Sequence, residues 1–121
     1  MFNRQVISDL SQIIPENTIV DPGFMTEELC FYQAHGMAPG WTVETQLTLP
    51  DGTAGETLAC NDAEHSPVAL GRPARPPQYV FILNRKAVWR PLDRALFLHG
   101  GAPAYEVALD SVPLFRVYRI Q

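Results

Sequence analysis

Long apolar runs are missing from this 121-residue chain, in which no stretch approaches the roughly 20 apolar residues that a membrane-spanning helix needs. Charged residues make up only 18%, and there are two cysteines. Two widely spaced cysteines give neither the paired ligand clusters of a zinc site nor a dense disulfide framework. The Walker, G-x-G-x-x-G and G-x-S-x-G patterns are also missing. The sequence therefore contains no motif that specifies an enzyme class, a metal site or a cofactor.

What the chain does contain is the composition of one globular domain. Hydrophobic residues make up 46%, and a chain of this length can bury roughly two-thirds of its unfolded surface. Eleven prolines, about twice the usual share, fall mostly in connections between periodic segments. Residues 1–121 are therefore expected to form a single α/β domain with irregular loops. A helix that begins directly after Met1 suggests a domain excised from a larger protein.

The first half predicts two helices around a short strand. The first helix follows from an apolar stripe with 3.6-residue spacing: Val6, Ile7, Leu10, Ile13 and Ile14. Asn3 is its expected N-cap, and Pro15 ends it. Residues 18–21 predict a buried strand. Residues 26–35 predict a second helix capped by Thr26, with Gly36 just past its end.

The second half predicts a mixed sheet. Residues 41–49 alternate, with Trp41, Val43, Leu47 and Leu49 on one face, and residues 56–60 are expected to return as the hairpin partner. Residues 61–77 predict an irregular surface loop, and the apolar run 78–83 predicts a central strand. Residues 86–92 predict a short helical turn that Pro91 ends, and residues 96–98 predict a short strand. Residues 104–109 and 114–120 predict a closing pair of strands. The expected fold is a small mixed sheet with the two helices of the first half packed on it.

Charge is distributed unevenly along the chain. Residues 1–71 carry one base and ten acids, whereas residues 72–121 carry eight bases and three acids. One interpretation is that these charges interleave on one surface. The other is a basic face toward a lipid headgroup or phosphate, formed by Arg72, Arg75, Arg85, Lys86, Arg90 and Arg94. Trp89 lies among these cations, either at a headgroup boundary or as a packed indole. Nucleic acid is not an expected partner, because the total charge is −4 and no RNA-binding motif occurs.

Two segments are candidates for ligand binding. Asp21 ends a predicted strand, and ligands of open α/β sheets gather at the carboxyl ends of strands. The alternative is that Asp21 caps the turn that follows it. His99, Gly100 and Gly101 could present backbone N–H groups to an anion, although a tight turn is the simpler interpretation.

The cysteines leave further alternatives open. Cys30 is expected to be a buried thiol, and a disulfide with Cys60 is the alternative in an oxidising compartment. Cys60 also precedes three possible metal ligands: Asp62, Glu64 and His65. Their spacing matches no standard site, so a solvated loop is favoured over a metal site. An enzyme with Cys60 as nucleophile and His65 as base is a third functional hypothesis.

Three short motifs resemble the soluble C-terminal domain of polytopic membrane glycosyltransferases, the relatives of dolichyl-phosphate-mannose–protein mannosyltransferases. Such domains often approach their first strand through P-x-x-T/V-I/V, matched within Ile14–Val20. Their helix ending in Leu-x-Phe-Tyr is matched by Leu29–Tyr32, and their V-P-L-x-x-V-Y ending by Val112–Tyr118. The resemblance covers residues 3–35 and 78–120.

This resemblance implies a non-catalytic accessory domain on the extracytoplasmic face of a membrane, periplasmic or extracellular. Its partners would be the transmembrane part of its parent protein and a polyprenyl-phosphate-linked sugar or membrane headgroups. The family's catalytic acids lie between transmembrane helices, so none is carried over to this chain. The alternative is a stand-alone, cytoplasmic module that binds a small molecule in a cleft near Asp21 and His99.

Overall fold

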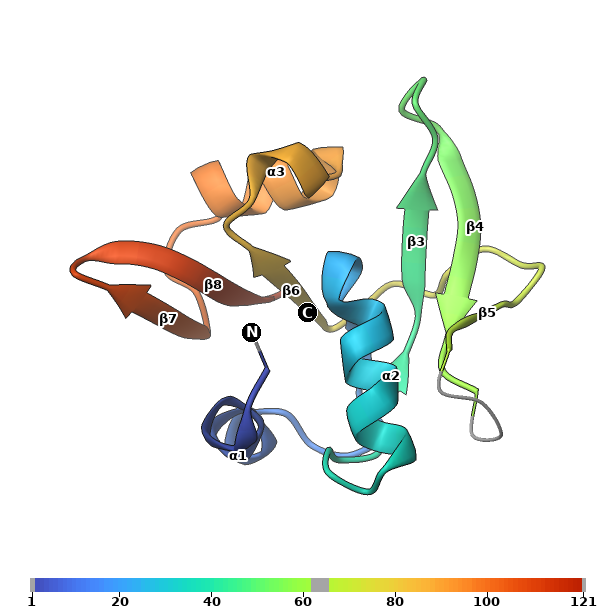
Figure 1. Ribbon diagram of the computed structural model, residues 1–121. Helices are drawn as coiled ribbons and strands as arrows, with labels where there is room; N and C mark the ends of the chain where they lie inside the picture. The colour runs from blue at the N-terminus through green and yellow to red at the C-terminus, as the bar shows by residue number, and fades with distance from the viewer. Residues whose placement is uncertain (1, 62–65, 121) are drawn as a thin grey trace.

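The computed structural model describes residues 2–61 and 66–120 (Figure 1). Its first half contains, in chain order, α1 (Arg4–Ile13), β1 (Ile19–Asp21), the 3₁₀ turn η1 (Gly23–Met25), α2 (Thr26–Ala34), β2 (Thr42–Val43), β3 (Thr45–Thr48) and β4 (Ala54–Ala59). Its second half contains β5 (Val68–Ala69), β6 (Tyr79–Leu83), the 3₁₀ turn η2 (Lys86–Val88), α3 (Pro91–His99), β7 (Tyr105–Leu109) and β8 (Val112–Arg119).

Five strands form the main sheet, in the order β2-β1-β6-β8-β7. β1 runs parallel to β2 and β6, whereas β8 runs antiparallel to β6 and β7. β6 lies in the middle, and its first four residues are buried. A strand that is covered on both faces needs a continuous apolar sequence, and residues 78–83 supply it. The prediction of a central strand there is confirmed.

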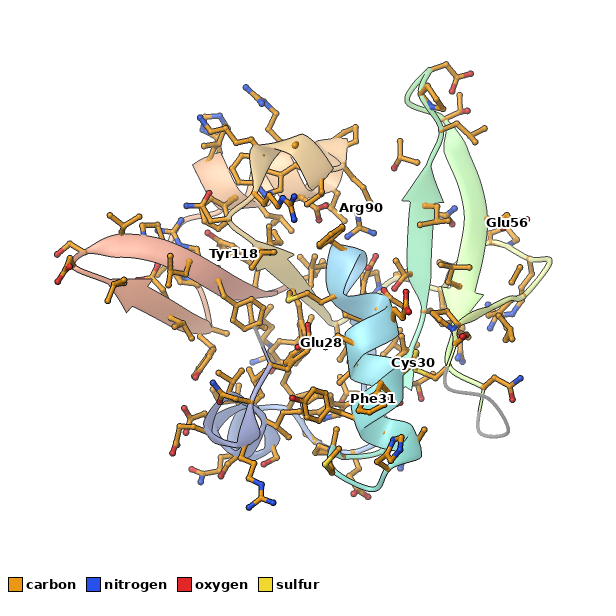
Figure 2. All side chains as sticks on the ribbon, in the orientation of Figure 1. Glu28, Cys30, Phe31, Glu56, Arg90 and Tyr118 are labelled. Carbon is orange, nitrogen blue, oxygen red and sulfur yellow. A yellow bond between two sulfur atoms is a disulfide. The ribbon has the colours of Figure 1, made fainter. Side chains whose placement is uncertain are left out.

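Helices cover both faces of the main sheet. One face packs against α1 and α2 through a core that includes Leu10, Leu29, Phe81, Phe115 and Val117. The opposite face packs against α3 through a smaller cluster of Val80, Ile82, Phe97 and Tyr118. Figure 1 shows α3 on the far side of β6 and β8 from α1, and Figure 2 shows the side chains that fill the space between. The predicted α/β class is confirmed, with a third helix that the sequence pattern did not indicate.

The first helix begins and ends where the sequence indicates. The Asn3 side chain accepts a hydrogen bond from the backbone N–H of Val6 at 2.9 Å, so it is the N-cap. Ile14, just before Pro15, has an extended rather than a helical backbone, so the helix ends there.

α2 differs from the prediction at its start, because it continues directly from η1 and Thr26 does not cap it. Instead, the Thr26 hydroxyl donates to the carbonyl of Gly23.

The predicted strand over residues 41–49 is divided between two sheets. β2 belongs to the main sheet, whereas β3 pairs with β4 in a separate three-stranded sheet, β3-β4-β5, called the small sheet below. The hairpin prediction is confirmed, but the facing residues are not as predicted. Glu44 and Thr45 are buried, whereas Leu47 is 37% and Leu49 is 49% exposed. A break between β2 and β3 shifts the alternation, which places polar rather than apolar residues inside.

The loop predicted over residues 61–77 contains a short strand. β5 pairs with β4 through Ala69 opposite Leu58 and Val68 opposite Ala59. The remainder of residues 66–77 has no regular structure, apart from bends.

Residues 96–98 lie in a helix, not in the short strand that was predicted. Pro91 occupies the first turn of α3, where its missing N–H is no loss, so it begins a helix rather than ending one. Leu98 is 46% exposed whereas Phe97 is buried, as one face of a helix requires. Three consecutive apolar residues are too short a run to distinguish a strand from a helix.

The closing pair of strands is confirmed, with a turn of only two residues between β7 and β8. Asp110 and Ser111 both have positive φ, 50° and 68°, which matches the twist of a tight hairpin. Pro113 lies within β8, opposite Ala108, where the register shifts.

No helix among the described residues is long and apolar enough to cross a bilayer.

The two cysteines form a disulfide bond between α2 and the end of the β4 segment. The expectation of a free buried thiol at Cys30 was therefore wrong, and the alternative holds. The bond joins positions 30 residues apart. Cys30 lies in the core, with Cys60 packed against it, so this bond attaches the small sheet to the main body of the domain.

Candidate functional site

The carboxyl ends of β1 and β6 lie at one edge of the main sheet, because these strands are parallel. Asp21 is the last residue of β1 and is 2% exposed. Its carboxylate accepts a hydrogen bond from the N–H of Gly23 at 2.9 Å, so it does cap the turn that follows. Both carboxylate oxygens also accept from Nη1 of Arg90, at 3.0 and 2.8 Å. The strand end therefore holds a buried ion pair.

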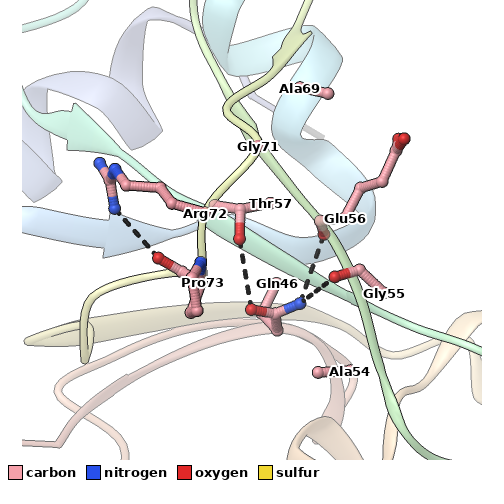
Figure 3. A pocket seen from close by; sticks show the side chains of 9 residues that line it. All are labelled: Gln46, Ala54, Gly55, Glu56, Thr57, Ala69, Gly71, Arg72 and Pro73. Atoms are coloured by element: carbon pink, nitrogen blue, oxygen red, sulfur yellow. Dashed lines mark hydrogen bonds between the residues drawn. The ribbon is translucent and has the colours of Figure 1, made fainter.

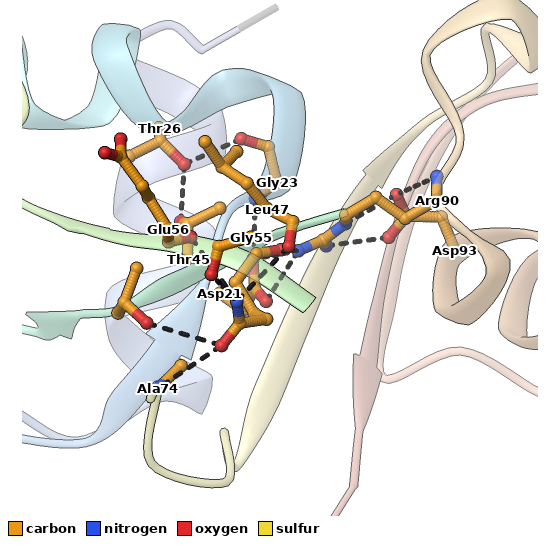
Figure 4. A network of polar contacts seen from close by, with 12 residues as sticks. Asp21, Gly23, Thr26, Thr45, Leu47, Gly55, Glu56, Ala74, Arg90 and Asp93 are labelled. Atoms are coloured by element: carbon orange, nitrogen blue, oxygen red, sulfur yellow. Dashed lines mark hydrogen bonds and ion pairs between the residues drawn. The ribbon is translucent and has the colours of Figure 1, made fainter. Parts of the chain in front are cut away.

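Arg90 connects three parts of the molecule through one guanidinium group (Figure 4). It precedes α3 and reaches Asp21 on β1, and its Nε and Nη2 donate to Asp93 at 3.0 and 2.8 Å. Its Nη1 also donates to the backbone carbonyl of Gln46 on β3 at 2.9 Å. Only 11% of its side chain is exposed. The position where open α/β sheets bind ligands is thus filled by a side chain of the protein itself.

Burial governs the electrostatics of this cluster. Loss of solvation raises the pKa of Asp21 above its ordinary value, although Arg90 and the Gly23 N–H oppose that effect. Burial disfavours the charged form of Arg90 as well, but Asp93 and Asp21 outweigh it and hold the pKa of Arg90 above its usual range. The charged groups of this cluster satisfy one another, because the Arg90 guanidinium donates hydrogen bonds to both carboxylates.

The predicted ligand residues do not come together. His99 ends α3, whereas Arg90 and Asp21 lie at its start, and nine helical residues span about 13 Å. Gly100 caps the helix and packs closely against Tyr118, which leaves no room for a side chain there. Gly101 turns the chain with φ at +75°. The tight-turn interpretation holds for this segment, although it follows a helix rather than a strand.

The predicted basic patch is divided by the fold. Arg85, Lys86 and Arg94 are exposed, whereas Arg90 points inward. Trp89 is half-buried: its indole N–H donates to the carbonyl of Leu83 at 2.8 Å. Its ring lies 5.0 Å from that of Phe97, so it is the packed indole of the two alternatives.

An apolar groove of about 600 Å³ lies beside the strand ends. Its residues come from η1, α2, Ser66 and the end of β6: Phe24, Met25, Glu27, Glu28, Phe31, Ser66 and Leu83. Phe24 is 56% and Phe31 is 44% exposed, and the guanidinium of Arg85 lies 5.6 Å from the centre of the Phe24 ring. The sequence pattern did not indicate this groove, because Phe24 stands in a turn and Phe31 on a helix with little amphipathic character.

A second buried carboxylate, Glu44, lies between β2 and β3, at one of the polar positions that alternate with the apolar residues of 41–49. It accepts hydrogen bonds from Nη1 and Nη2 of Arg72 at 3.0 and 2.8 Å. It also accepts from the backbone N–H and Nε of Arg75, at 2.9 and 2.7 Å. These donors, Arg72 first, lower the pKa of Glu44 to about 2.

Two hollows flank Arg72. One, of about 270 Å³, is lined by both arginines together with residues of α2, β2 and the end of β4. The other, of about 400 Å³, lies over the small sheet, where Gln46 bonds to Thr57 and Gly55 (Figure 3). The side chains that point into both hollows are mainly polar or small.

The structure leaves no thiol for nucleophilic catalysis, because both cysteines are bonded to each other. Asp62, Glu64 and His65, the remaining candidates for metal binding or base catalysis, lie outside the described residues. Among the residues that are described, no group of three or more His, Cys, Asp or Glu side chains is arranged to hold a metal ion.

Comparison of this chain with protein families, with characterised proteins and with solved structures finds no match.

Proposed function

We propose that this chain is a non-catalytic accessory domain of a membrane-bound, glycosyltransferase-like protein that uses a polyprenyl-phosphate-linked sugar. The observation that carries the proposal is the Cys30–Cys60 disulfide. Disulfides persist in oxidising compartments and are rare in the cytosol. The bond therefore supports an extracytoplasmic location, periplasmic or extracellular, which is where the resembling domains lie.

The positions of the resembling segments also support this proposal. Residues 3–35 and 78–120 include α1, α2, α3 and four of the five strands of the main sheet. β2 and the three strands of the small sheet lie outside these two segments. The resemblance thus coincides with one structural unit rather than with scattered fragments of the chain.

The apolar groove supplies a contact for the transmembrane part of the parent protein. Exposed aromatic side chains are costly to leave in water, and clustered ones commonly mark interaction surfaces. Phe24 and Phe31 line this groove. The alternative, a stand-alone module with a cleft at Asp21, is less favoured, because Arg90 fills that position.

The gene itself provides the first test. We expect the open reading frame around this segment to encode several apolar stretches of about 20 residues. A reading frame without them would overturn the membrane parent.

A thiol assay in cells provides the second test. We expect Cys30 and Cys60 to resist a maleimide reagent unless the protein is first reduced. Full labelling of both cysteines without a reductant would contradict the extracytoplasmic location.

A further inference from the structure

The segment from Arg72 to Arg75 is held in place by a buried acid, Glu44. Glu44 is 2% exposed, and its carboxylate accepts hydrogen bonds from both guanidinium groups and from one backbone N–H of this segment. A second anchor is the side chain of Gln46, which accepts from the N–H of Ala74 at 3.2 Å. The two guanidinium groups are therefore fixed before any ligand arrives, which lowers the entropic cost of binding.

This cluster retains both charge and hydrogen-bonding capacity. Two guanidinium groups share one carboxylate, which leaves a net charge of +1. Of their ten N–H bonds, five find an acceptor among the described residues: four toward Glu44 and one to the carbonyl of Pro73. Five donors remain on side chains that are 44% and 54% exposed, those of Arg72 and Arg75 respectively.

The space beside these donors suits a small oxyanion. The hollow lined by both arginines measures about 270 Å³, far above the roughly 10–15 Å³ that a cavity needs to hold one water molecule. Thr42, Gln33 and Glu44 also line it, and the charge of Glu44 is already matched by the two arginines. A phosphate group offers several acceptor oxygens, and guanidinium groups bind it through paired, charge-assisted hydrogen bonds.

We propose that Arg72 and Arg75, held by Glu44, form a binding site for a phosphate group. The phosphate is either a free one or that of a lipid headgroup, since both present the same oxygens. This inference does not rest on the parent protein being a glycosyltransferase, so its failure would leave the proposed function standing.

The main experiment follows the backbone amides of the intact chain by NMR while inorganic phosphate is added at constant ionic strength. We expect saturable shifts at the amides of Arg72, Ala74, Arg75 and Glu44. Arg72→Gln and Arg75→Gln should each weaken phosphate binding by about tenfold, since each removes charge-assisted donors. Arg4→Gln, an exposed position on α1, is the matched control and should leave binding unchanged. Equal shifts with chloride, or equal binding by all three variants, would overturn the proposal.

A second measurement uses the unaltered protein, in case a variant does not fold. We expect phosphate to protect Arg72 and Arg75 from phenylglyoxal relative to Arg4 and Arg85, as read by mass spectrometry. Vesicles of phosphatidic acid in phosphatidylcholine distinguish the two sources. Protection by these vesicles, competed by free phosphate, assigns the site to a headgroup, whereas protection by free phosphate alone assigns it to a soluble ligand. No selective protection by either would refute the site.

Discussion

The main sheet and the small sheet are stabilised by different interactions. The main sheet buries aromatic and aliphatic side chains: Phe81 and Phe115 are almost fully buried, and their rings meet edge to face. In the small sheet the most deeply buried residues are Thr45 and Thr57. Among the described residues, polar and covalent contacts connect it to the main body: they include the Cys30–Cys60 disulfide, the Thr26–Thr45 hydroxyl contact, the Arg90–Gln46 bond and the ion pairs of Glu44.

The difference separates two sources of stability. Hydrophobic burial is non-directional and scales with area, so the main sheet depends on how well its core is filled. Polar connections depend on partners that must be present together, because a lone buried charge is costly. Changes in the main sheet should therefore affect the whole domain, whereas changes at these connections should release the small sheet first.

The largest expected effect comes from the core of the main sheet. Phe81→Ala should lower the free energy of unfolding by about 3–5 kcal/mol, because it removes a ring at 1% exposure and leaves a cavity. Urea denaturation measures this change. Phe24→Ala, at 56% exposure, is the control and should change stability little. Equal losses from both would show that Phe81 does not hold the core.

Removing the guanidinium that joins both sheets should cost nearly as much. Arg90→Ala leaves Asp21 and Asp93 buried without their partner, and we expect a loss of about 3 kcal/mol or more. Arg94→Ala on the same helix is the exposed control. A stability loss no larger than that of the control would mean that water replaces the guanidinium without cost.

Loss of the disulfide should be intermediate in size. Cys30→Ala combined with Cys60→Ala should destabilise the protein by about 2–4 kcal/mol, since the bond closes a loop of 30 residues. Hydrogen exchange should rise first at β3, β4 and β5. Uniform acceleration across both sheets would contradict the release of the small sheet before the main sheet. Reduction of the unaltered protein should reproduce the variant.

A smaller loss is expected from the acid beneath the arginines. Glu44→Gln weakens charge-assisted hydrogen bonds, which are worth about 1.5–3 kcal/mol. We expect thermal unfolding at a lower temperature, with early exchange of the amides of Ala74 and Arg75, whose N–H groups bond to Gln46 and Glu44. Glu56→Gln, an exposed position on β4, should have no such effect. Identical melting of the two variants would remove Glu44 from the set of connections.

Acid should act on the two buried carboxylates with opposite sign. The pKa of Glu44 is lowered from 4.5 to about 2, so its contribution is complete above pH 4.5 and is lost as pH falls toward 2. The pKa of Asp21 is raised above 3.8, so stability falls as pH rises through its titration. Urea midpoints measured from pH 5 to 2 should therefore drop less steeply in Glu44→Gln than in the unaltered protein. Parallel pH profiles would contradict the lowered pKa.

The same division explains what the sequence could predict. α1, β1 and β6 follow directly from the spacing of apolar residues and from Asn3 and Pro15, because burial of a face imposes a period on the sequence. α3 was missed because Pro91 fits a helix start as well as a stop, and Leu96–Leu98 is too short to show a period.

The candidate sites were harder to predict than the fold. Glu44 and Gln46 occupy the polar positions of an alternating segment, and only the break between β2 and β3 turns them inward. Arg90 is one of several arginines in a basic stretch, and nothing local distinguishes it from Arg94. Partners such as Asp21, 69 positions away, are brought to it only by the complete fold. The Cys30–Cys60 bond likewise depends on where α2 and β4 finally meet.

The disulfide also determines what a single cut in the backbone would do. The turn between β3 and β4 is exposed at Asp51 and Gly52, and it lies between the two bonded cysteines. A protease that cleaved there would produce two chains that the disulfide still joins covalently, with most strands of the main sheet on the second chain. The two fragments could separate only after the disulfide is reduced, so a single backbone cut in this turn would not divide the domain.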